Sequence, residues 1–388
     1  MLARGAALLR PGSLTRLLYR LRTEADGPGR QAAAIGLGMY IGCTPFYGFH
    51  LLLAVALASL FRLNRLKVYL AANISNPLIA PVLVAAEIQV GGWLTRGAWY
   101  SPATIRRAAV WGIAEDLLLG SIVVGLVFGA LAAAVTYAMV RRQSLHPTLA
   151  RLIENAAARY LPTGFASWEM ASGKLSGDPV YLGVLRSGIL PAHGTVVDCG
   201  CGRGLMLALL AEARTLRDEP WPPDWPTPPS SLELVGIETR SRMVKMARLA
   251  LGADASIVEA DLRHSDIPKG NVMLLFDVLH LMPRTEQDAF LRRLREAVAP
   301  GGLLIIREAD AAGGWRFLTI RVFNWTTRAL QGQWGRRFHF RTVNEWRQSL
   351  SAAGFDVETE PMGGGTPFAN IVLYARRMGD AGRTGTRA

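Results

Sequence analysis

The sequence predicts an α/β fold, with a doubly wound sheet of mostly parallel strands, preceded by a separate all-helical region. A β-branched run at 195–199 leads through a glycine-rich loop into a helix-like stretch. Further apolar runs alternate with helical stretches as far as residue 310, and several of them end in an acidic residue. The part before residue 141 instead contains long runs that carry almost no charge. These two halves cannot share one core, so we expect at least two domains.

The composition divides the chain into five parts. Residues 1–30 are a basic N-terminal segment, and residues 31–142 are rich in apolar runs. Residues 143–180 form a polar linker with leading helices, and residues 181–377 form the α/β domain. Residues 378–388 are polar and glycine-rich, which predicts a disordered tail.

The net charge of +13 is unevenly distributed. Residues 1–150 hold 14 Lys and Arg against 5 Asp and Glu, so most of the basic surplus lies in the apolar part. This placement favours contact with the anionic headgroups of membrane lipids. A nucleic-acid partner is not predicted, because no basic run interleaved with aromatic residues marks a binding groove.

The three cysteines predict neither a disulfide framework nor a metal site. Cys199 and Cys201 flank a glycine within the loop, and Cys43 lies in an apolar run. A zinc site needs four ligands, which this spacing does not supply. We therefore expect no metal and a reducing, cytoplasmic environment for the α/β domain.

Three apolar blocks predict a membrane domain. Residues 31–61 are split near Pro45, and residues 66–94 are split at Asn76-Pro77, so each block predicts a kinked span or a re-entrant hairpin. Residues 117–140 form an uncharged run that is long enough to cross a bilayer.

Arginines flank these blocks on both sides. Residues 1–30 interleave arginine with leucine, which is typical of an amphipathic helix on a membrane surface or, equally, of a solvated tail. Arg141 and Arg142 follow the last block. The positive-inside rule places both ends in the cytoplasm, so the chain is predicted to be a multi-pass protein of the bacterial inner membrane, with an even number of crossings.

Part of this region resembles a bacterial family, the domain-of-unknown-function family 2062, over about residues 28–140. The matching positions are glycines, prolines and asparagines: Gly36, Gly42, Pro45, Gly48, Asn64 and Asn76-Pro77. The resemblance implies a membrane location and no known reaction. Gly125 and Gly129 add a spacing that lets another helix approach closely.

The loop after residue 199 is the strongest signal for a ligand site. Asp198 is followed by glycines at alternate positions, Gly200, Gly202 and Gly204. A strand, glycine loop and helix let a ligand approach bare backbone at the N-terminus of the helix. A dinucleotide-binding loop would need glycine at position 205, which is Leu205 in this chain, so a dehydrogenase is disfavoured.

This pattern resembles the first motif of the class I S-adenosylmethionine-dependent methyltransferases, over roughly residues 165–376. The resemblance implies a Rossmann-like seven-stranded methyltransferase sheet and S-adenosylmethionine as the cofactor. The strands at 355–360 and 369–376 resemble the closing hairpin of that sheet. It also implies that Asp261 accepts a hydrogen bond from the adenine amino group and that the backbone of Leu262 meets the ring.

Acids at the ends of other strands complete the predicted cofactor site. Glu238 ends the strand that begins near residue 232, where a carboxylate can accept hydrogen bonds from both ribose hydroxyls. Asp277 and His280 follow the apolar run that begins at residue 271. Because open α/β sheets bind ligands at the carboxyl ends of their strands, Asp277 is assigned to the cofactor site.

His280 is the candidate general base for an acceptor hydroxyl, since imidazole titrates near neutrality. The alternative is a histidine that only hydrogen-bonds a neighbouring loop. Four basic residues either orient a substrate or form a solvated or lipid-facing patch: Arg336, Arg337, His339 and Arg341.

Two further segments have two interpretations each. The helix-like stretch 314–330 mixes aromatic residues with arginines, so it rests on a bilayer or packs on the sheet. Trp221 and Trp225 lie in a proline-rich insertion and either contact a membrane or substrate or pack over their own loop.

Together these features predict a membrane-anchored methyltransferase that uses S-adenosylmethionine and acts on a lipophilic small molecule or a lipid, by O- or C-methylation. Its predicted partners are membrane lipids and this acceptor. The alternative, from a different class, is a catalytically inactive S-adenosylmethionine-binding module of a membrane assembly.

Overall fold

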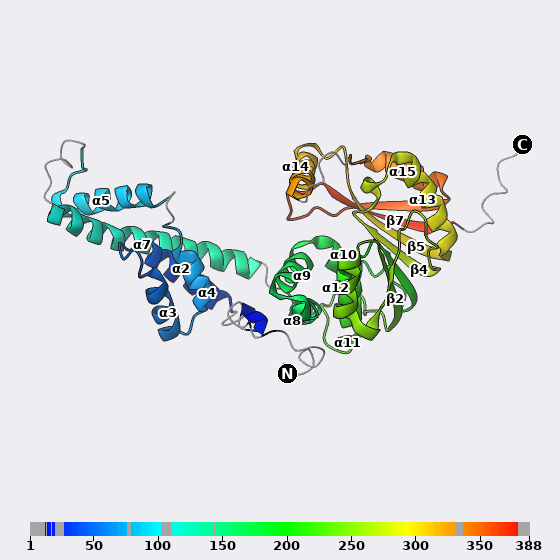
Figure 1. The fold of residues 1–388 in the computed structure, drawn as a ribbon, viewed down its shortest axis with the longest axis horizontal. Coiled ribbons are helices and arrows are strands. Elements are labelled where there is room, and N and C mark those ends of the chain that lie inside the picture. Colours follow the sequence, from blue (N-terminus) through cyan, green and yellow to red (C-terminus); the bar gives the residue numbers. More distant parts are fainter. Residues whose placement is uncertain are drawn as a thin grey trace, which may run out of the picture. The chain divides into compact units, whose positions relative to one another are not determined.

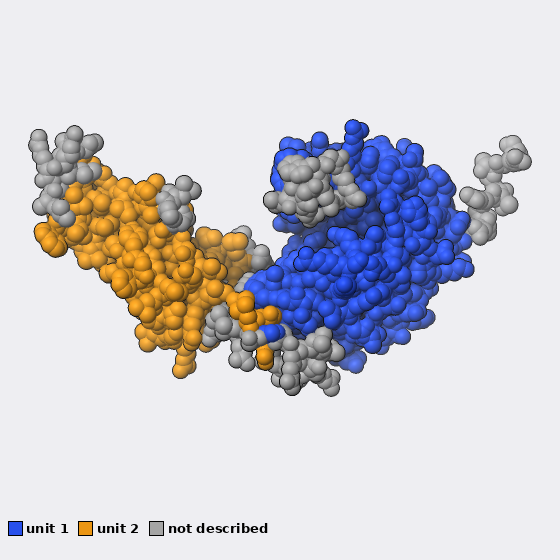
Figure 2. Space-filling model, viewed as in Figure 1, with its two compact units in different colours: residues 1–12, 146–388 blue, residues 13–145 orange. Residues whose placement is uncertain are grey.

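The computed structural model describes residues 12, 14–16, 18–19, 27–75, 79–101, 110–142, 145–330 and 337–378. The chain forms two compact units, one of residues 13–145 and the other of residues 1–12 and 146–388 (Figure 2).

The C-terminal unit is built on one seven-stranded sheet, in the order β3-β2-β1-β4-β5-β7-β6 (Figure 1). Neighbours among the first five strands pair in parallel, while β7 runs antiparallel to both β5 and β6. The strands are β1 (His193–Cys199), β2 (Ser231–Glu238), β3 (Ser256–Glu259), β4 (Gly270–Phe276), β5 (Val298–Ala309), β6 (Phe355–Pro361) and β7 (Asn370–Arg377). The predicted seven-stranded methyltransferase-type sheet is therefore confirmed.

Helices alternate with the strands and cover the sheet. They are α8 (Pro147–Ala158), α9 (Phe165–Gly177), α10 (Pro179–Arg186), α11 (Leu205–Thr215), α12 (Ser241–Leu251), α13 (Arg284–Ala297), α14 (Gly314–Leu330) and α15 (Val343–Ala352). The strand order reverses between β1 and β4, because β2 and β3 lie on one side of β1 while β4 and β5 lie on the other. Open α/β sheets place their ligands at such a reversal, outside the carboxyl ends of the strands.

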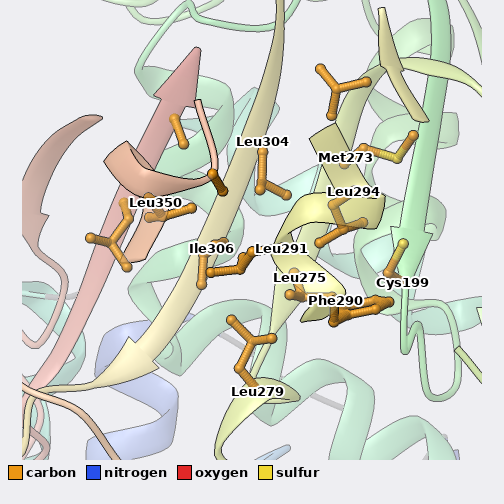
Figure 3. Packing of buried hydrophobic residues seen from close by; sticks show 14 of the residues in the cluster. Cys199, Met273, Leu275, Leu279, Phe290, Leu291, Leu294, Leu304, Ile306 and Leu350 are labelled. Atoms are coloured by element: carbon orange, nitrogen blue, oxygen red, sulfur yellow. The ribbon is translucent and has the colours of Figure 1, made fainter. Parts of the chain in front are cut away.

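One face of the sheet packs against α13 and α15 (Figure 3). Alternate residues of the central strands, such as Met273 and Leu275 of β4, contribute to this core with Leu291 and Leu294 of α13. This alternation follows from the two-residue period of a strand. On the other face α11 packs against β2, where a Cβ added at Gly236 would lie 2.9 Å from Leu207 Cδ1.

Two strands end earlier than their apolar runs predict. The run 255–262 forms a strand only to Glu259, because the backbone of Asp261 and its side chain both accept hydrogen bonds in a turn. The run 271–282 forms a strand only to Phe276. Asp277 there takes a left-handed conformation, with a φ of 59°, and a short 3₁₀ helix follows at Leu279–Leu281. Periodicity alone does not reveal these turns.

The N-terminal unit is helical, with α2 (Pro28–Gly42), α3 (His50–Leu60), α4 (Arg65–Ala72), α5 (Ala80–Arg96) and α7 (Val110–Arg142). The predicted break near Pro45 separates α2 from α3. The second predicted break, Asn76-Pro77, lies outside the described residues, as do most of residues 1–30, Arg336 and residues 379–388. In the described part of the chain, one helix is long and apolar enough to cross a membrane, over Trp111–Val140, and an 18-residue window within it has a mean hydropathy of 2.5.

Helix α7 begins before the predicted start at residue 117, and its first turns carry Asp116. That buried carboxylate accepts hydrogen bonds from Thr95 Oγ1 at 2.7 Å and from the Tyr100 hydroxyl at 2.5 Å, and it pairs with Arg96. These partners offset the cost of burying the charge within an otherwise apolar helix.

Glycines allow α2 and α7 to approach closely. A Cβ added at Gly129 would lie 2.8 Å from the carbonyl oxygen of Gly36, and one at Gly125 would lie 3.0 Å from Tyr40 Cδ2. The predicted role of the Gly125 and Gly129 spacing is therefore confirmed within this unit.

We predict that Gly129→Val pushes α2 away from α7 and lowers the stability of the N-terminal unit by about 1 to 3 kcal/mol. Thermal unfolding of the detergent-purified chain measures this change. Gly112→Val on the same helix is the matched control, because no atom lies within 4 Å of a Cβ added at Gly112. An equal midpoint for the two variants would contradict the prediction.

Candidate active site

The glycine loop after β1 turns toward the end of β2. Gly200, Gly202 and Gly204 have φ angles of 84°, 57° and 76°, a region that favours glycine. A Cβ at Gly200 would lie 2.6 Å from Val278 Cγ2, so the loop also approaches the segment after β4 closely. At Gly202 the nearest atom to an added Cβ is Glu238 Oε2, at 4.0 Å. The backbone of Gly202 thus borders open space beside Glu238.

Glu238 ties this loop to β2. Its Oε2 accepts the backbone N–H of Gly202 at 2.9 Å, and its Oε1 accepts both the N–H and the Nε–H of Arg240, at 2.9 Å and 3.0 Å. Burial opposes ionisation of this carboxyl, but the hydrogen bonds from Arg240 and Gly202 outweigh burial and hold its pKa below the usual value. The loop and Glu238 therefore lie at one edge of the sheet, as the predicted cofactor site requires.

Asp198 lies beneath the loop at the end of β1 and is buried. Burial, followed by the negative charge of Glu238, raises the pKa of Asp198 to about 7. The pKa values of the neighbouring carboxyls Asp198 and Glu238 are therefore shifted in opposite directions, a feature that is common at binding sites for charged ligands.

Asp261 and Leu262 lie just beyond β3 rather than within it. Ala260 donates its N–H to the carbonyl of Glu238, which holds this segment beside the end of β2. Arg263 binds the Asp261 carboxylate and is the main cause that lowers its pKa to about 2. The side chain of Leu262 is buried in the core, so its backbone is the part available near the edge.

Asp277 is engaged by a residue that sequence reasoning missed. The buried guanidinium of Arg307, on β5, pairs with both Asp277 and Asp178. Although burial disfavours its charge, the two carboxylates raise the pKa of Arg307 above its usual value. Since Asp178 also caps α10 by accepting the N–H of Val180, this cluster fastens α10 to the sheet edge.

His280 forms a buried pair with a second missed residue, Glu308. The imidazole Nδ1 lies 2.8 Å from Glu308 Oε2, while Glu308 Oε1 accepts the N–H of Leu279 at 2.7 Å. The ring of His280 stacks on Phe340, with centroids 4.9 Å apart and planes 13° apart. Glu308 lies near the end of the apolar run that was predicted to form a strand before residue 310. An acidic residue at the end of that strand was the sequence feature that could have indicated a role at the site.

These groups open onto a cavity of about 400 Å³. Its lining comes from α9 and α10, the ends of β4 and β5, α14 and the segment before β7: Gly173, Lys174, Gly177, Asp178, Pro179, Asp277, His280, Arg307, Ala309, Ile320, Phe323, Asn324, Phe340, Thr366, Phe368 and Asn370. Val278, which contacts Gly200 of the loop, lies between two of these residues, Asp277 and His280. The cavity and the loop are therefore neighbours.

One proposed substrate contact is structural instead. Arg341 is buried, pairs with Asp288 at 2.9 Å and lies over the ring of Trp346, so it does not orient a ligand. The backbone N–H of His339 donates to the carbonyl of His280, at 2.8 Å, and the role of its imidazole stays a prediction. Arg337 is exposed.

The two tryptophans of the proline-rich insertion pack locally. Trp221 donates its Nε1–H to the carbonyl of Leu216 at 2.9 Å, and its ring lies 6.2 Å from that of Trp225. The interpretation in which they pack over their own loop holds.

Comparison with known families agrees with this geometry. Residues 181–360 match the family described as a methyltransferase domain, and residues 13–146 match DUF2062, described as an uncharacterized protein conserved in bacteria. The chain therefore carries a methyltransferase domain preceded by a DUF2062 domain. Both resemblances predicted from the sequence are confirmed, as is S-adenosylmethionine as the cofactor of the methyltransferase domain.

The curated relatives have a more specific name. The chain is 29% identical to the carboxy-S-adenosyl-L-methionine synthase of Aliivibrio fischeri strain MJ11 over 132 residues, which is 33% of this chain and 49% of the relative. It is 30% identical to the synthase of the same name from Chromohalobacter salexigens over 132 residues, 33% of this chain and 44% of the relative. The chain thus spans about half the length of the curated relatives it matches.

Similar solved structures include two methyltransferases. One is magnesium protoporphyrin IX methyltransferase from Synechocystis PCC 6803, with 18% identity, a TM-score of 0.36 and coverage of 63% of this chain and 94% of that chain. The other is the N-methyltransferase NodS from Bradyrhizobium japonicum WM9, with 17% identity, a TM-score of 0.37 and coverage of 53% and 90%.

The residues at the edge fit S-adenosylmethionine, whose sulfonium is positively charged. The bare backbone at Gly202 leaves space for it, and Asp198 and Glu238 supply two buried carboxyls. We predict that Glu238→Gln weakens cofactor binding at least about tenfold, because it removes a charge-assisted acceptor. Calorimetry on the full chain measures this. The control is Glu259→Gln, an exposed position that pairs with Glu238 across the sheet and should bind normally.

The raised pKa of Asp198 predicts a pH-dependent stability. Because the folded pKa of about 7 exceeds the ordinary value of 3.8, the stabilisation from holding the proton is full below about pH 4 and is lost as pH rises to about 7. Asp198→Asn cannot ionise. In the absence of cofactor, the difference between the thermal midpoints of Asp198→Asn and the wild type should therefore increase by about 5 °C in favour of the variant from pH 5 to pH 8. The exposed Asp266→Asn variant should show no such slope, and a flat Asp198→Asn difference would refute the prediction.

Proposed function

We propose that this protein is a membrane-anchored methyltransferase that transfers a methyl group from S-adenosylmethionine to a lipophilic acceptor. The observation that carries the proposal is the aromatic cavity beside the glycine loop, with His280 in its wall and Glu308 behind it as the hydrogen-bond partner of His280. A cavity of about 400 Å³ is of the size that small-molecule sites have.

The lining of the cavity favours an apolar acceptor with few polar groups. Ile320, Phe323, Phe340 and Phe368 supply large apolar side chains to the lining, and Phe340 stacks on His280. Such a lining excludes water and holds a ring or chain by burial of apolar surface. Asn370 and its polar neighbours at the rim supply the hydrogen bonds that orient a ligand.

The His280–Glu308 pair supplies the base that an acceptor hydroxyl needs. The carboxylate at Nδ1 favours the tautomer with the proton on that nitrogen, which makes Nε2 the basic atom. When bound, S-adenosylmethionine supplies an electrophilic methyl group. His280 takes the acceptor proton as the acceptor oxygen or carbon becomes nucleophilic, and Glu308 stabilises the imidazolium that forms.

The N-terminal unit supports the membrane location. Its helix Trp111–Val140 has 30 residues and contains an 18-residue window with a mean hydropathy of 2.5, and exposed side chains on α7 include Leu126, Val127 and Leu131. The arginines that flank the apolar blocks support a multi-pass arrangement in the inner membrane of a bacterium, with the methyltransferase unit in the cytoplasm. An enzyme held there meets acceptors dissolved in the bilayer at a raised local concentration.

The name of the curated relatives gives a second candidate, in which S-adenosylmethionine itself is carboxylated. Such a reaction needs a donor of the carboxyl group, and a cationic side chain is needed to bind the carboxylate of that donor. Arg307 already pairs with Asp178 and Asp277, which leaves the exposed Lys174 at the rim as the candidate contact. We favour methyl transfer because the larger part of the lining away from the sheet edge is apolar.

The test incubates the purified chain with S-adenosylmethionine labelled in its methyl group and a membrane lipid extract. We expect label in the lipid fraction. Label only in water-soluble products would reject the lipophilic acceptor, and a mass increase of the cofactor itself would favour the carboxylation alternative. Tight cofactor binding with no product in any fraction would favour the inactive module.

We predict that His280→Asn and Glu308→Gln each lower kcat by about 10²- to 10⁴-fold, since general-base catalysis contributes an effect of this size. Cofactor affinity, measured by calorimetry, should stay within a few-fold of wild type, because neither residue contacts the glycine loop through any hydrogen bond described above. The exposed His264→Asn is the control and should keep full activity. Unchanged kcat in both active-site variants would remove His280 as the base.

A further inference from the structure

We propose that the outer face of α14 docks on an anionic phospholipid bilayer and passes lipophilic acceptors from the membrane into the cavity. This inference rests on the proposed function for its delivery step, while the docking step stands on the surface of the helix alone.

The outer face of α14 is a continuous apolar stripe. Trp315, Leu318, Val322 and Trp325 are 67%, 57%, 53% and 61% exposed. Their spacing of three, four and three residues places them on one side of the helix. Soluble surfaces rarely expose four large apolar side chains in a row, so this stripe marks an interaction site.

The opposite face of the same helix faces the cavity. Ile320 is 8% exposed and lines the cavity with Asn324. Thr319 donates its hydroxyl to the carbonyl of Pro367, and Arg316 donates to the carbonyls of Gly363 and Thr366. The inner face therefore anchors α14 to the sheet domain, while the side chains of the stripe are more than half exposed.

An apolar groove lies between the stripe and the cavity. Its volume is about 590 Å³, and Phe317, Leu318, Val322, Trp325 and Phe338 contribute to its walls. Phe340 lines both this groove and the cavity that contains His280. An apolar molecule that leaves a bilayer at the stripe thus meets a mainly apolar lining, which Phe340 continues into the cavity that contains His280.

Charge favours a bilayer over a protein as the occupant. The sequence of α14 contains three arginines and no acidic residue. Arg321 is exposed and lines the groove, where it faces the same side as Leu318 and Trp325. Tryptophan and arginine beside aliphatic side chains are the composition that lies at the interface of anionic membranes. The same chain also carries an apolar helix of membrane-spanning length, Trp111–Val140.

Site-specific labelling tests the docking step on the full chain. The three native cysteines, Cys43, Cys199 and Cys201, are buried, so a cysteine at an exposed position takes the label selectively. Leu318→Cys carries an environment-sensitive fluorophore on the stripe. Leu249→Cys on α12 is the matched control away from α14, because Leu249 is 51% exposed and Leu318 is 57% exposed.

The labelled chains are reconstituted in vesicles of phosphatidylcholine, with or without phosphatidylglycerol, that contain brominated acyl chains. We expect the label at 318 to shift to the blue and to be quenched at least about twofold more than the label at 249, with the larger effect in phosphatidylglycerol. Equal quenching at the two positions would overturn the proposal. A blue shift at 318 without quenching by the lipid would overturn it as well, because a protein surface would then cover the helix.

The delivery step is tested with Trp315→Glu, because Trp315 belongs to the stripe but lines neither the groove nor the cavity. Methyl transfer to acceptor embedded in vesicles should fall about tenfold, because an acid replaces an interfacial aromatic, while transfer to the same acceptor in detergent stays unchanged. Leu249→Glu should leave both rates unchanged. An equal loss in vesicles and detergent would overturn the delivery step. Absence of transfer by the wild type in both media would reject the proposed function, and the quenching result would still decide the docking.

Discussion

The active site depends on the concentration of carboxyl groups at one edge of the sheet. Asp198, Glu238, Asp277 and Glu308 end or follow four strands, and like charges at short range disfavour one another. Each has a different form of compensation. Asp198 holds its proton more tightly, Glu238 accepts hydrogen bonds from Gly202 and Arg240, Asp277 pairs with an arginine, and Glu308 binds an imidazole. Asp198 and Glu238 lie beside the glycine loop, where a cationic cofactor is expected.

The hydrophobic core positions these groups. Leu279 is buried in the cluster formed with α13 (Figure 3). Because Leu279 directly precedes His280, its packing fixes the backbone position from which the imidazole extends. Arg307 performs the equivalent task for the opposite wall, since it joins α10 to the end of β4 through two carboxylates. The cavity is thus framed by elements whose side chains are closely packed, which holds the residues of its lining in fixed positions.

In the proposed membrane-associated enzyme, the two units have different roles. Close glycine contacts between α2 and α7 hold the N-terminal unit together without large side chains, as is typical of helices packed in a bilayer. The C-terminal unit binds the cofactor. Within it, α14 combines a face that completes the cavity with a face that is apolar and basic, so one helix relates the site to the proposed membrane surface.

The sequence by itself determined the order of strands and helices, the glycine loop and Glu238, because periodicity and glycine positions are local properties. It also predicted His280, although not the partner that orients it. Only the tertiary structure decided the pairs His280–Glu308 and Arg307–Asp178, and the contact of Gly129 with Gly36, since these residues lie far apart in the chain. The two faces of α14 and the early ends of β3 and β4 were likewise decided by packing and hydrogen bonding, which no local pattern encodes.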